Sequence, residues 1–262
     1  MNQALEGAQL ITSDQAADHP VRLLHTADCH IGNFILDGDR ERDAFEALIE
    51  AALVIQPDVL VVAGDLFDHG RVTDEVIEWT LAQLSRVDCP VVVLPGNHDY
   101  DVLMRIVDGT HLTGYPGITI ITDHDGELVH LPEAGLTLWG RALEEHTPDH
   151  RPLHGLPERP DDGWCVALGH GLFVDPLNSG GRGSPIFPAD VAAVGWDYVA
   201  LGHVHMHRII RDLPEPPVVY SGATTMAHGG QPGAVLVEFH PANGVSFESI
   251  SLAGPGQSAI VG

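Results

Sequence analysis

The chain has 262 residues, of which 44% are hydrophobic and 29 are glycine, and this composition fits one large α/β domain and excludes a disordered or fibrous protein. No apolar run reaches the length of a membrane span, and residues 1–20 lack the basic start and apolar core of a signal peptide. All 12 basic side chains are arginine against 37 Asp and Glu, and the resulting net charge of −25 opposes long-range attraction of a nucleic acid.

The first part of the chain alternates between apolar runs and amphipathic segments. Strands are expected at Arg22–Thr26, Asp58–Ala63 and Val91–Leu94, and helices at Asp39–Ile55 and from the cap residue Thr73 to Ser85. The runs are rich in Val and Leu, which is typical of strands covered on both faces. This alternation predicts a parallel sheet with right-handed crossovers.

Shorter elements fill the rest of the chain. Strands at Ile118–Ile121, Glu127–Leu131 and Leu136–Trp139 are separated by turns, which predicts an antiparallel or mixed sheet. Further strands are expected at Trp164–Leu168, Tyr198–Leu201, Met206–Arg211, Val218–Tyr220, Ala234–Phe239 and Val245–Ile250. Thr147–Gly163 is expected to be a surface loop, Gly171–Pro188 a loop that borders a site, and Pro188–Val194 a short helix. We divide the chain into a flexible lead-in (1–20), one domain (21–250) and a tail (251–262).

The three cysteines are odd in number and have no regular spacing, so we expect neither a disulfide framework nor a CxxC zinc site. This usage indicates a reducing compartment, and we place the protein in the cytoplasm. Cys29 stands between two candidate ligands, but the alternation of an extended segment points its side chain to the opposite face. We expect it to pack in the core.

Side chains that bind metals follow five of the apolar runs, each at the carboxyl end of the run, where open α/β sheets bind their ligands. The seven candidates are Asp28, His30, Asp65, Asn97, His170, His203 and His205. Carboxylate with imidazole suits Mn²⁺, Fe or Zn²⁺ and suits Ca²⁺ poorly. Seven ligands are too many for one transition metal, and they predict two ions about 3.5–4 Å apart that share a carboxylate.

The motifs occur in the order Asp28-x-His30, Gly64-Asp65-x-x-Asp68, Gly96-Asn97-His98-Asp99, Gly169-His170 and Gly202-His203-x-His205. This series resembles that of the calcineurin-like metallophosphoesterases, and the wording around it is most similar to SbcD-type DNA repair exonuclease subunits. The resemblance extends from about residue 21 to residue 250. It implies a four-layer α/β/β/α sandwich, in which two mixed sheets are flanked by helices.

The resemblance also implies a role for each residue. One divalent ion is bound by Asp28, His30, Asp65 and His205, and the other by Asp65, Asn97, His170 and His203, so that Asp65 bridges. Mn²⁺ is the favoured metal, with Fe or Zn²⁺ as alternatives. A hydroxide held between the ions attacks phosphorus in line, His98 stabilises the phosphate or protonates the leaving oxygen, and Asp68 orients the imidazole of His98. Asp99 is a weaker candidate that supports a ligand.

Other titratable residues receive structural or solvated interpretations. We expect His25 to be structural, and we expect Asp37, Arg40 and Arg42 to belong to a solvated loop and helix start. His69, His207 and His228 are neighbours of the site in the sequence and could support it. The histidines expected at the surface are His111, His124, His130, His146, His150 and His154.

Three functions stay open. The leading hypothesis is a phosphodiesterase that resembles the SbcD-type exonucleases, with DNA as its substrate and, by the resemblance, a second copy or an ATPase as partner. SbcD-type nucleases carry a further capping region, which we expect to be absent or minimal after Ile250. The alternatives are therefore a phosphatase or phosphodiesterase of a small phosphorylated metabolite or nucleotide, and a non-catalytic binding module with the same fold.

Overall fold

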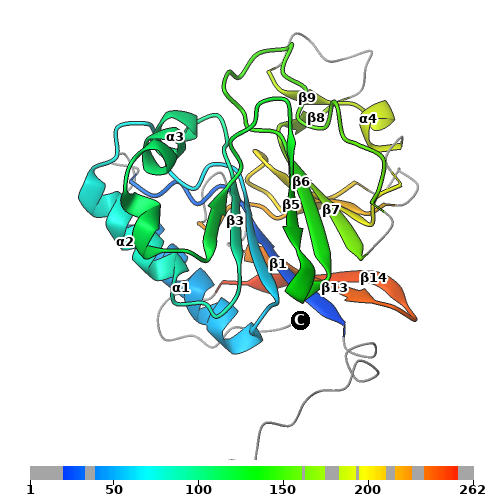
Figure 1. The fold of residues 1–262 in the computed structure, drawn as a ribbon, viewed down its shortest axis with the longest axis horizontal. Helices are drawn as coiled ribbons and strands as arrows, with labels where there is room; N and C mark the ends of the chain where they lie inside the picture. The colour runs from blue at the N-terminus through cyan, green and yellow to red at the C-terminus, as the bar shows by residue number, and fades with distance from the viewer. Residues whose placement is uncertain are drawn as a thin grey trace, which may run out of the picture.

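A computed structural model describes residues 20–32, 39–160, 163–174, 183–192, 195–210, 216–225 and 233–252. Two six-stranded sheets stack against each other, and helices α1, α2 and α3 lie along one side of the stack (Figure 1). The main helices are α1 (Asp39–Ile55), α2 (Asp74–Leu84), α3 (Tyr100–Asp108) and α4 (Pro188–Ala192), with single 3₁₀ turns η2 (His111–Gly114) and η3 (Pro132–Ala134). The expected fold class is therefore confirmed.

The first sheet has the order β14-β13-β1-β2-β3-β4. Its parallel strands are β1 (Val21–Thr26), β2 (Val59–Ala63), β3 (Val91–Leu94) and β4 (Ile118–Ile120). A hairpin formed by β13 (Gly233–His240) and β14 (Gly244–Ser251) pairs antiparallel with β1 and completes this sheet from the far end of the chain. The segment at Ile118 was expected beside the strands at Glu127–Leu131 and Leu136–Trp139. It pairs instead with β3, because a parallel register with Val91–Val93 buries its apolar side chains.

The second sheet has the order β11-β12-β10-β7-β6-β5. Four of its strands are parallel, and antiparallel strands stand at both edges. The strands are β5 (Glu127–Leu131), β6 (Leu136–Gly140), β7 (Trp164–His170), β10 (Tyr198–Gly202), β11 (Arg208–Ile209) and β12 (Val218–Tyr220). The strand expected at Met206–Arg211 is therefore shorter than predicted within the described residues.

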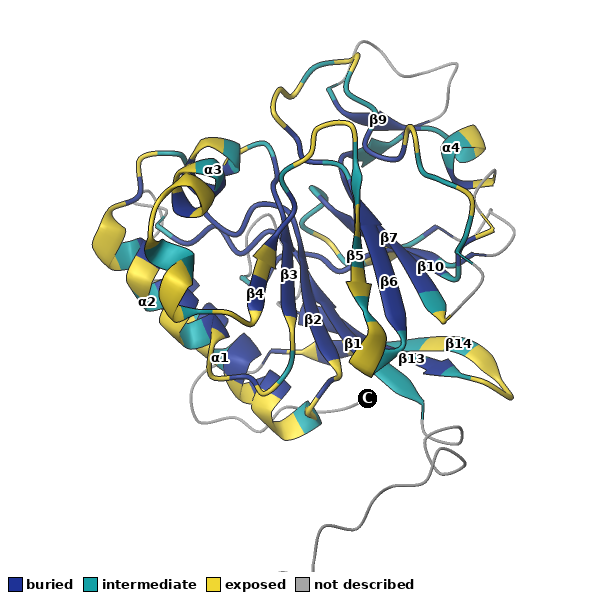
Figure 2. Ribbon diagram, in the orientation of Figure 1, coloured by how far each residue is buried: buried dark blue, intermediate teal, exposed yellow. Residues whose placement is uncertain are grey.

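Buried strands have apolar side chains on both faces, and this explains their unbroken runs of Val and Leu. In β2, Leu60 and Val62 face the helices, whereas Val59 and Val61 face the second sheet. Figure 2 shows the central strands buried and the outer faces of α1 and α2 exposed. One hydrophobic layer lies between the first sheet and the helices, and another lies between the two sheets. This packing fixes where the strand ends lie.

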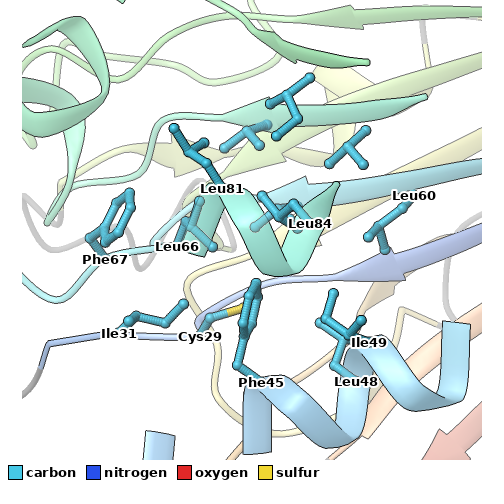
Figure 3. Close-up of a cluster of buried hydrophobic side chains, with 14 of the residues drawn as sticks. Cys29, Ile31, Phe45, Leu48, Ile49, Leu60, Leu66, Phe67, Leu81 and Leu84 are labelled. Atoms are coloured by element: carbon cyan, nitrogen blue, oxygen red, sulfur yellow. The ribbon is translucent and has the colours of Figure 1, made fainter. Parts of the chain in front are cut away.

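The layer under the helices is the larger one, and Figure 3 shows part of it. Phe45 and Leu48 of α1 pack with Leu81 of α2 against Leu60 of β2. Cys29 is fully buried in this layer, as its alternation predicts. Thr73 caps α2 by accepting a hydrogen bond from the N–H of Val76 at 3.4 Å, which also agrees with the prediction.

The outer face of the second sheet is covered by short elements. Ile186, Val191 of α4 and Trp196 pack there against Trp139 and Val199. The segment Gly171–Pro188, expected to be a loop, contains a small parallel sheet of β8 (Leu172–Phe173) and β9 (Pro185–Ile186). Leu153 is also buried against this face, so the segment at Thr147–Gly163 is in part a packed loop and not only a surface loop.

Several predictions lie outside the described residues: the lead-in before Pro20, Asp37, His228 and the tail after Leu252. No helix in the described ranges is long and apolar enough to cross a membrane. Helix α3 was not predicted, because its buried residues Val102, Leu103 and Ile106 make only one short apolar stripe directly after the motif at Gly96.

Candidate functional site

The candidate ligands meet because the backbone pairing of β1 and β2 continues past the ends of both strands. The N–H of Asp28 donates to the carbonyl of Gly64 at 3.0 Å, and the N–H of His30 donates to the carbonyl of Asp65 at 3.0 Å. These bonds place the first ligand pair beside Asp65. The same edge of the other sheet brings His170 at the end of β7 and His203 after β10 to the same place.

Four of the seven candidates have a left-handed backbone, which non-glycine residues rarely adopt. Their φ angles are 54° for Asp28, 49° for His30, 53° for Asp65 and 88° for His203. Such a conformation costs about 1–3 kcal/mol at each residue and persists where the surrounding structure enforces it. Four of the predicted ligands share this costly conformation, which indicates that the fold directs their side chains to a common point.

The first group of ligands consists of Asp28, His30 and His205, whose ligand atoms lie within 4.8 Å of one another. Nδ1 of His30 lies 3.0 Å from the carboxylate of Asp68, so a neutral His30 carries its proton on Nδ1. Its Nε2 lone pair then faces Nε2 of His205 at 3.2 Å. One of these two imidazole nitrogens must carry a proton for them to form a hydrogen bond. A cation bound by both nitrogens and by the buried carboxylate of Asp28 would take the place of that proton.

The second group is built around the other side of Asp65. Nε2 of His170 lies 3.2 Å from Oδ2 of Asp65 and 3.2 Å from Oδ1 of Asn97. Because Nδ1 of His170 donates to the carbonyl of Ala63 at 2.9 Å, Nε2 is the nitrogen left for a metal. Nδ1 of His203 lies 3.0 Å from the same amide oxygen of Asn97.

Asp65 joins the two groups. Its Oδ2 is 3.8 Å from Nε2 of His30 and 3.2 Å from Nε2 of His170, and its Oδ1 accepts a hydrogen bond from the N–H of His98 at 2.9 Å. The structure therefore brings together all seven predicted ligands, with the residue predicted to bridge in the middle. This is a candidate dimetal site of His, Asp and Asn side chains.

The electrostatics of the site also fit two cations. Burial, together with the nearby Asp65, raises the pKa of Asp28 to about 6, so this carboxyl is not fully compensated by positive charge. Burial lowers the pKa of His170, but the carboxylate of Asp65 outweighs burial and raises that pKa to about 9. Burial also opposes ionisation of Asp65, yet the imidazole of His170 holds its pKa below the usual range. Without a metal ion, a proton on His170 supplies the positive charge beside Asp65 that a cation would otherwise supply.

His98 and Asp68 stand beside the first group. The ring of His98 meets the ring of His30 edge to face, with 4.9 Å between centroids, and the side chain of His98 is exposed. Nδ1 of His98 donates to the main-chain carbonyl of Asp68 at 2.7 Å, whereas the carboxylate of Asp68 lies against His30. The carboxylate of Asp68 was expected to orient His98, but it contacts His30, and the contact to Nδ1 of His98 comes from the main-chain carbonyl.

Asp99 is fully buried behind the centre and accepts three backbone hydrogen bonds. The donors are the N–H groups of Leu66 and Gly96, each at 2.7 Å, and of Phe67 at 3.2 Å. The carboxylate therefore ties the loop after β2 to the loop after β3. Burial and the neighbouring Asp65 raise the pKa of Asp99 to about 7.

Two glycines allow the close approach of these loops. A Cβ on Gly96 would lie 2.1 Å from Oδ1 of Asp65, and a Cβ on Gly64 would lie 1.9 Å from Nδ1 of His170. Gly64 also has a φ of +96°, which favours glycine. The glycines in the motifs therefore have a packing reason, since any side chain would displace a candidate ligand.

Histidines outside the motifs have varied surroundings. His25 is fully buried and its Nδ1 lies 3.2 Å from the hydroxyl of Tyr198, so its predicted structural role is confirmed. His150 was expected at the surface but is half-buried, and burial lowers its pKa to about 4. His146 is exposed as expected, but its ring lies 5.0 Å from that of His203, so it borders the site. Sequence reasoning missed this contact.

Comparison with known proteins agrees with this arrangement. The family model described as calcineurin-like phosphoesterase matches residues 21–207. The chain is 27% identical to the SbcD subunit of the nuclease SbcCD from Bacillus subtilis, over 91% of this chain and 68% of that protein. It is 28% identical to the DNA double-strand break repair protein Mre11 of Aeropyrum pernix, over 74% of this chain. The chain spans about half the length of that relative, since the match covers 51% of it.

Solved structures show the same fold at lower identity. TT1561 of Thermus thermophilus matches with a TM-score of 0.58 and 13% identity, over 89% of this chain and 100% of that one. A dimetal phosphatase from Danio rerio matches with a TM-score of 0.53 and 12% identity, also over 89% and 100%. At these identities the likeness supports the fold and carries no statement about the substrate.

Proposed function

Because the chain belongs to the calcineurin-like phosphoesterase family, we propose that it hydrolyses phosphodiesters with the help of two divalent ions, as an enzyme of the exonuclease type. The observation that carries this proposal is the convergence of two groups of acceptors on Asp65. Two ions about 3.5–4 Å apart are the usual means of activating a water and neutralising phosphate oxygens in an in-line displacement. Mn²⁺ is the proposed metal, with Fe or Zn²⁺ as alternatives.

The residues of this chain would divide the work. Asp28, His30 and His205 would hold one ion, and Asn97, His170 and His203 the other. Asp65 would contribute one carboxylate to both. The bound ions would act as Lewis acids toward the phosphate and supply a nucleophile at neutral pH.

His98 is placed to handle the leaving group. Its Nδ1 is held by the carbonyl of Asp68, so its Nε2 is the atom that can face a substrate. When the imidazole carries two protons, Nε2 can donate to a phosphate oxygen or pass its proton to the leaving oxygen. The edge-to-face contact with His30 holds the ring over the first group of ligands.

Two substrate classes follow from different observations. Similarity to SbcD and to Mre11 favours the phosphodiester of DNA. The net charge of −25 favours a small phosphorylated metabolite or nucleotide, because 37 acidic side chains against 12 arginines repel a large polyanion. We propose DNA as the first substrate to test and the small phosphoester as the second.

The test compares three substrates in the presence of Mn²⁺: linear duplex DNA, bis(p-nitrophenyl) phosphate and p-nitrophenyl phosphate. We expect cleavage of both diesters and slower cleavage of the monoester. Asp65→Asn and His98→Ala should each reduce the rate by at least ~100-fold, which is the scale of a catalytic acid or base. His154→Ala, which changes an exposed histidine outside the site, is the control.

Each outcome separates the candidates. Cleavage of the small diester without cleavage of DNA would replace the nuclease proposal by the small-substrate proposal. Failure to cleave any of the three while two ions are bound would favour a binding module. Cleavage by Asp65→Asn at the wild-type rate would contradict the mechanism.

Assembly and location are part of the same proposal. The name of the Bacillus subtilis relative describes one subunit of a larger nuclease, and we propose that this chain likewise pairs with a second copy or with an ATPase partner in the cytoplasm. Light scattering coupled to size-exclusion chromatography tests the first alternative. Co-purification from the native host, followed by mass spectrometry, tests the second.

A further inference from the structure

A second exposed histidine borders the candidate centre, beside the group of ligands that His98 does not contact. The ring of His146 lies 5.0 Å from the ring of His203, with 42° between the ring planes. The ring of His98 lies 4.9 Å from that of His30. Each group of candidate ligands thus has one exposed imidazole beside it, and only His98 belongs to a family motif.

His146 is held by a buried residue in an unusual conformation. Its Nδ1 lies 3.1 Å from the hydroxyl of Ser184, which is fully buried. Ser184 has a φ of +48°, so among the described residues it shares a left-handed backbone with four of the candidate ligands. Glycine would adopt this conformation at lower cost, and the serine at this position places its hydroxyl against Nδ1 of His146.

Backbone hydrogen bonds join the segments that carry His146 and Ser184. The N–H of Ser184 donates to the carbonyl of Thr147 at 2.8 Å, and the carbonyl of Ser184 accepts from the N–H of Leu172 at 3.0 Å. A Cβ on Gly183 would lie 2.6 Å from the ring of His146, so this position accommodates only glycine. The ring of His146 therefore contacts Ser184 and His203 and lies close to Gly183, while the residue stays exposed.

On the basis of the proposed function, we propose that His146 is a substrate-binding residue that donates a hydrogen bond from Nε2 to a phosphate oxygen beside His203, and that Ser184 is its positioning residue. A serine hydroxyl can donate to Nδ1, and a neutral imidazole whose Nδ1 accepts carries its proton on Nε2. The substrate phosphate would then accept hydrogen bonds from two histidines: His98 beside one group of ligands and His146 beside the other.

The experiment measures turnover and anion binding in the same variants. With Mn²⁺-loaded protein, kcat and KM are measured on bis(p-nitrophenyl) phosphate, and the affinity for inorganic phosphate is measured by calorimetry. His146→Ala should lower kcat/KM and phosphate affinity by about 10- to 100-fold, as expected for the loss of one hydrogen bond to a charged group, with two ions still bound. His146→Gln, which keeps a donor near the position of Nε2, should recover part of the loss.

Ser184→Ala tests the positioning role by a double-mutant cycle. It should lower kcat/KM by about 3- to 10-fold in the wild-type background and by less than about 2-fold in the His146→Ala background, because its effect passes through the imidazole. His154→Ala, on the same segment as His146, should match the wild type in every measurement. An equal effect of Ser184→Ala in both backgrounds would show a merely structural role.

The failures of this inference and of the proposed function are distinct. Wild-type turnover and phosphate affinity that persist in His146→Ala would overturn the inference and leave the function standing. Loss of a bound ion in His146→Ala would also overturn it, since the residue would then act through His203. Phosphate binding that depends on His146, in a protein that cleaves no phosphoester, would uphold the inference and refute the function.

Discussion

Replacing Asp99 by asparagine tests how the fold holds the metal ligands. The two oxygens of Asp99 accept hydrogen bonds from three buried N–H groups, two in the loop after β2 and one at Gly96 after β3. Asparagine keeps one oxygen and turns an NH₂ group toward at least one of these donors. One orphaned buried donor costs about 1–3 kcal/mol. The raised pKa of Asp99 shows that folding disfavours its charge, so removing the charge adds nothing to this cost.

We therefore expect Asp99→Asn to lower the free energy of unfolding by about 1–3 kcal/mol, the cost of one buried donor left without an acceptor. Urea unfolding in EDTA measures this, at about pH 8 so that Asp99 is mainly ionised in the wild type. Asp101→Asn, an exposed change in the first turn of the same helix, should cost less than about 1 kcal/mol.

The same variant should bind Mn²⁺ more weakly. Gly96 approaches Asp65 so closely that a shift of the loop after β3 displaces the shared carboxylate. We expect the dissociation constant for Mn²⁺ to rise by at least about tenfold, or about 1.4 kcal/mol. A loss of stability no greater than that of Asp101→Asn, or unchanged Mn²⁺ affinity, would refute the role assigned to Asp99.

Three further predictions concern single sites. Gly96→Ala should abolish Mn²⁺ binding with the circular dichroism spectrum retained, because its Cβ would lie 2.1 Å from Oδ1 of Asp65, whereas Gly114→Ala, which has no atom within 4 Å, should bind normally. Burial lowers the pKa of His25 to about 3. When the pH falls from 8 to 5.5, His25 therefore becomes protonated in the unfolded chain but stays neutral in the native protein. Over that range in EDTA the wild type should therefore lose about 1–2 kcal/mol more stability than His25→Phe, and an equal pH dependence in both would contradict the assignment. Thr73→Ala should cost about 1 kcal/mol in urea unfolding, and no loss would show that the cap at 3.4 Å contributes nothing.

The strand-end ligands could be predicted from the sequence because parallel strands present their carboxyl ends at one edge. Asp28, Asp65 and Asn97 follow three neighbouring strands of one sheet. The position of each ligand directly after its strand was therefore enough to predict that these side chains lie close together. The burial of Cys29 was also predicted, although the residues on either side of it have a left-handed backbone and are not extended.

Features that depend on distant segments could not be predicted. The contacts of His146 with His203 and with Ser184 join residues that are far apart in the sequence. The place of β4 in the first sheet depends on a register with β3 that short apolar runs do not encode. Helix α3 was missed because its three buried residues form only one short apolar stripe after the motif at Gly96.

The central claim is that Asp65 stands between two bound cations. Anomalous diffraction from crystals grown with Mn²⁺ measures this directly. We predict two peaks about 3.5–4 Å apart, each with an oxygen of Asp65 in its coordination sphere. A single peak, or two peaks that do not share Asp65, would contradict the claim.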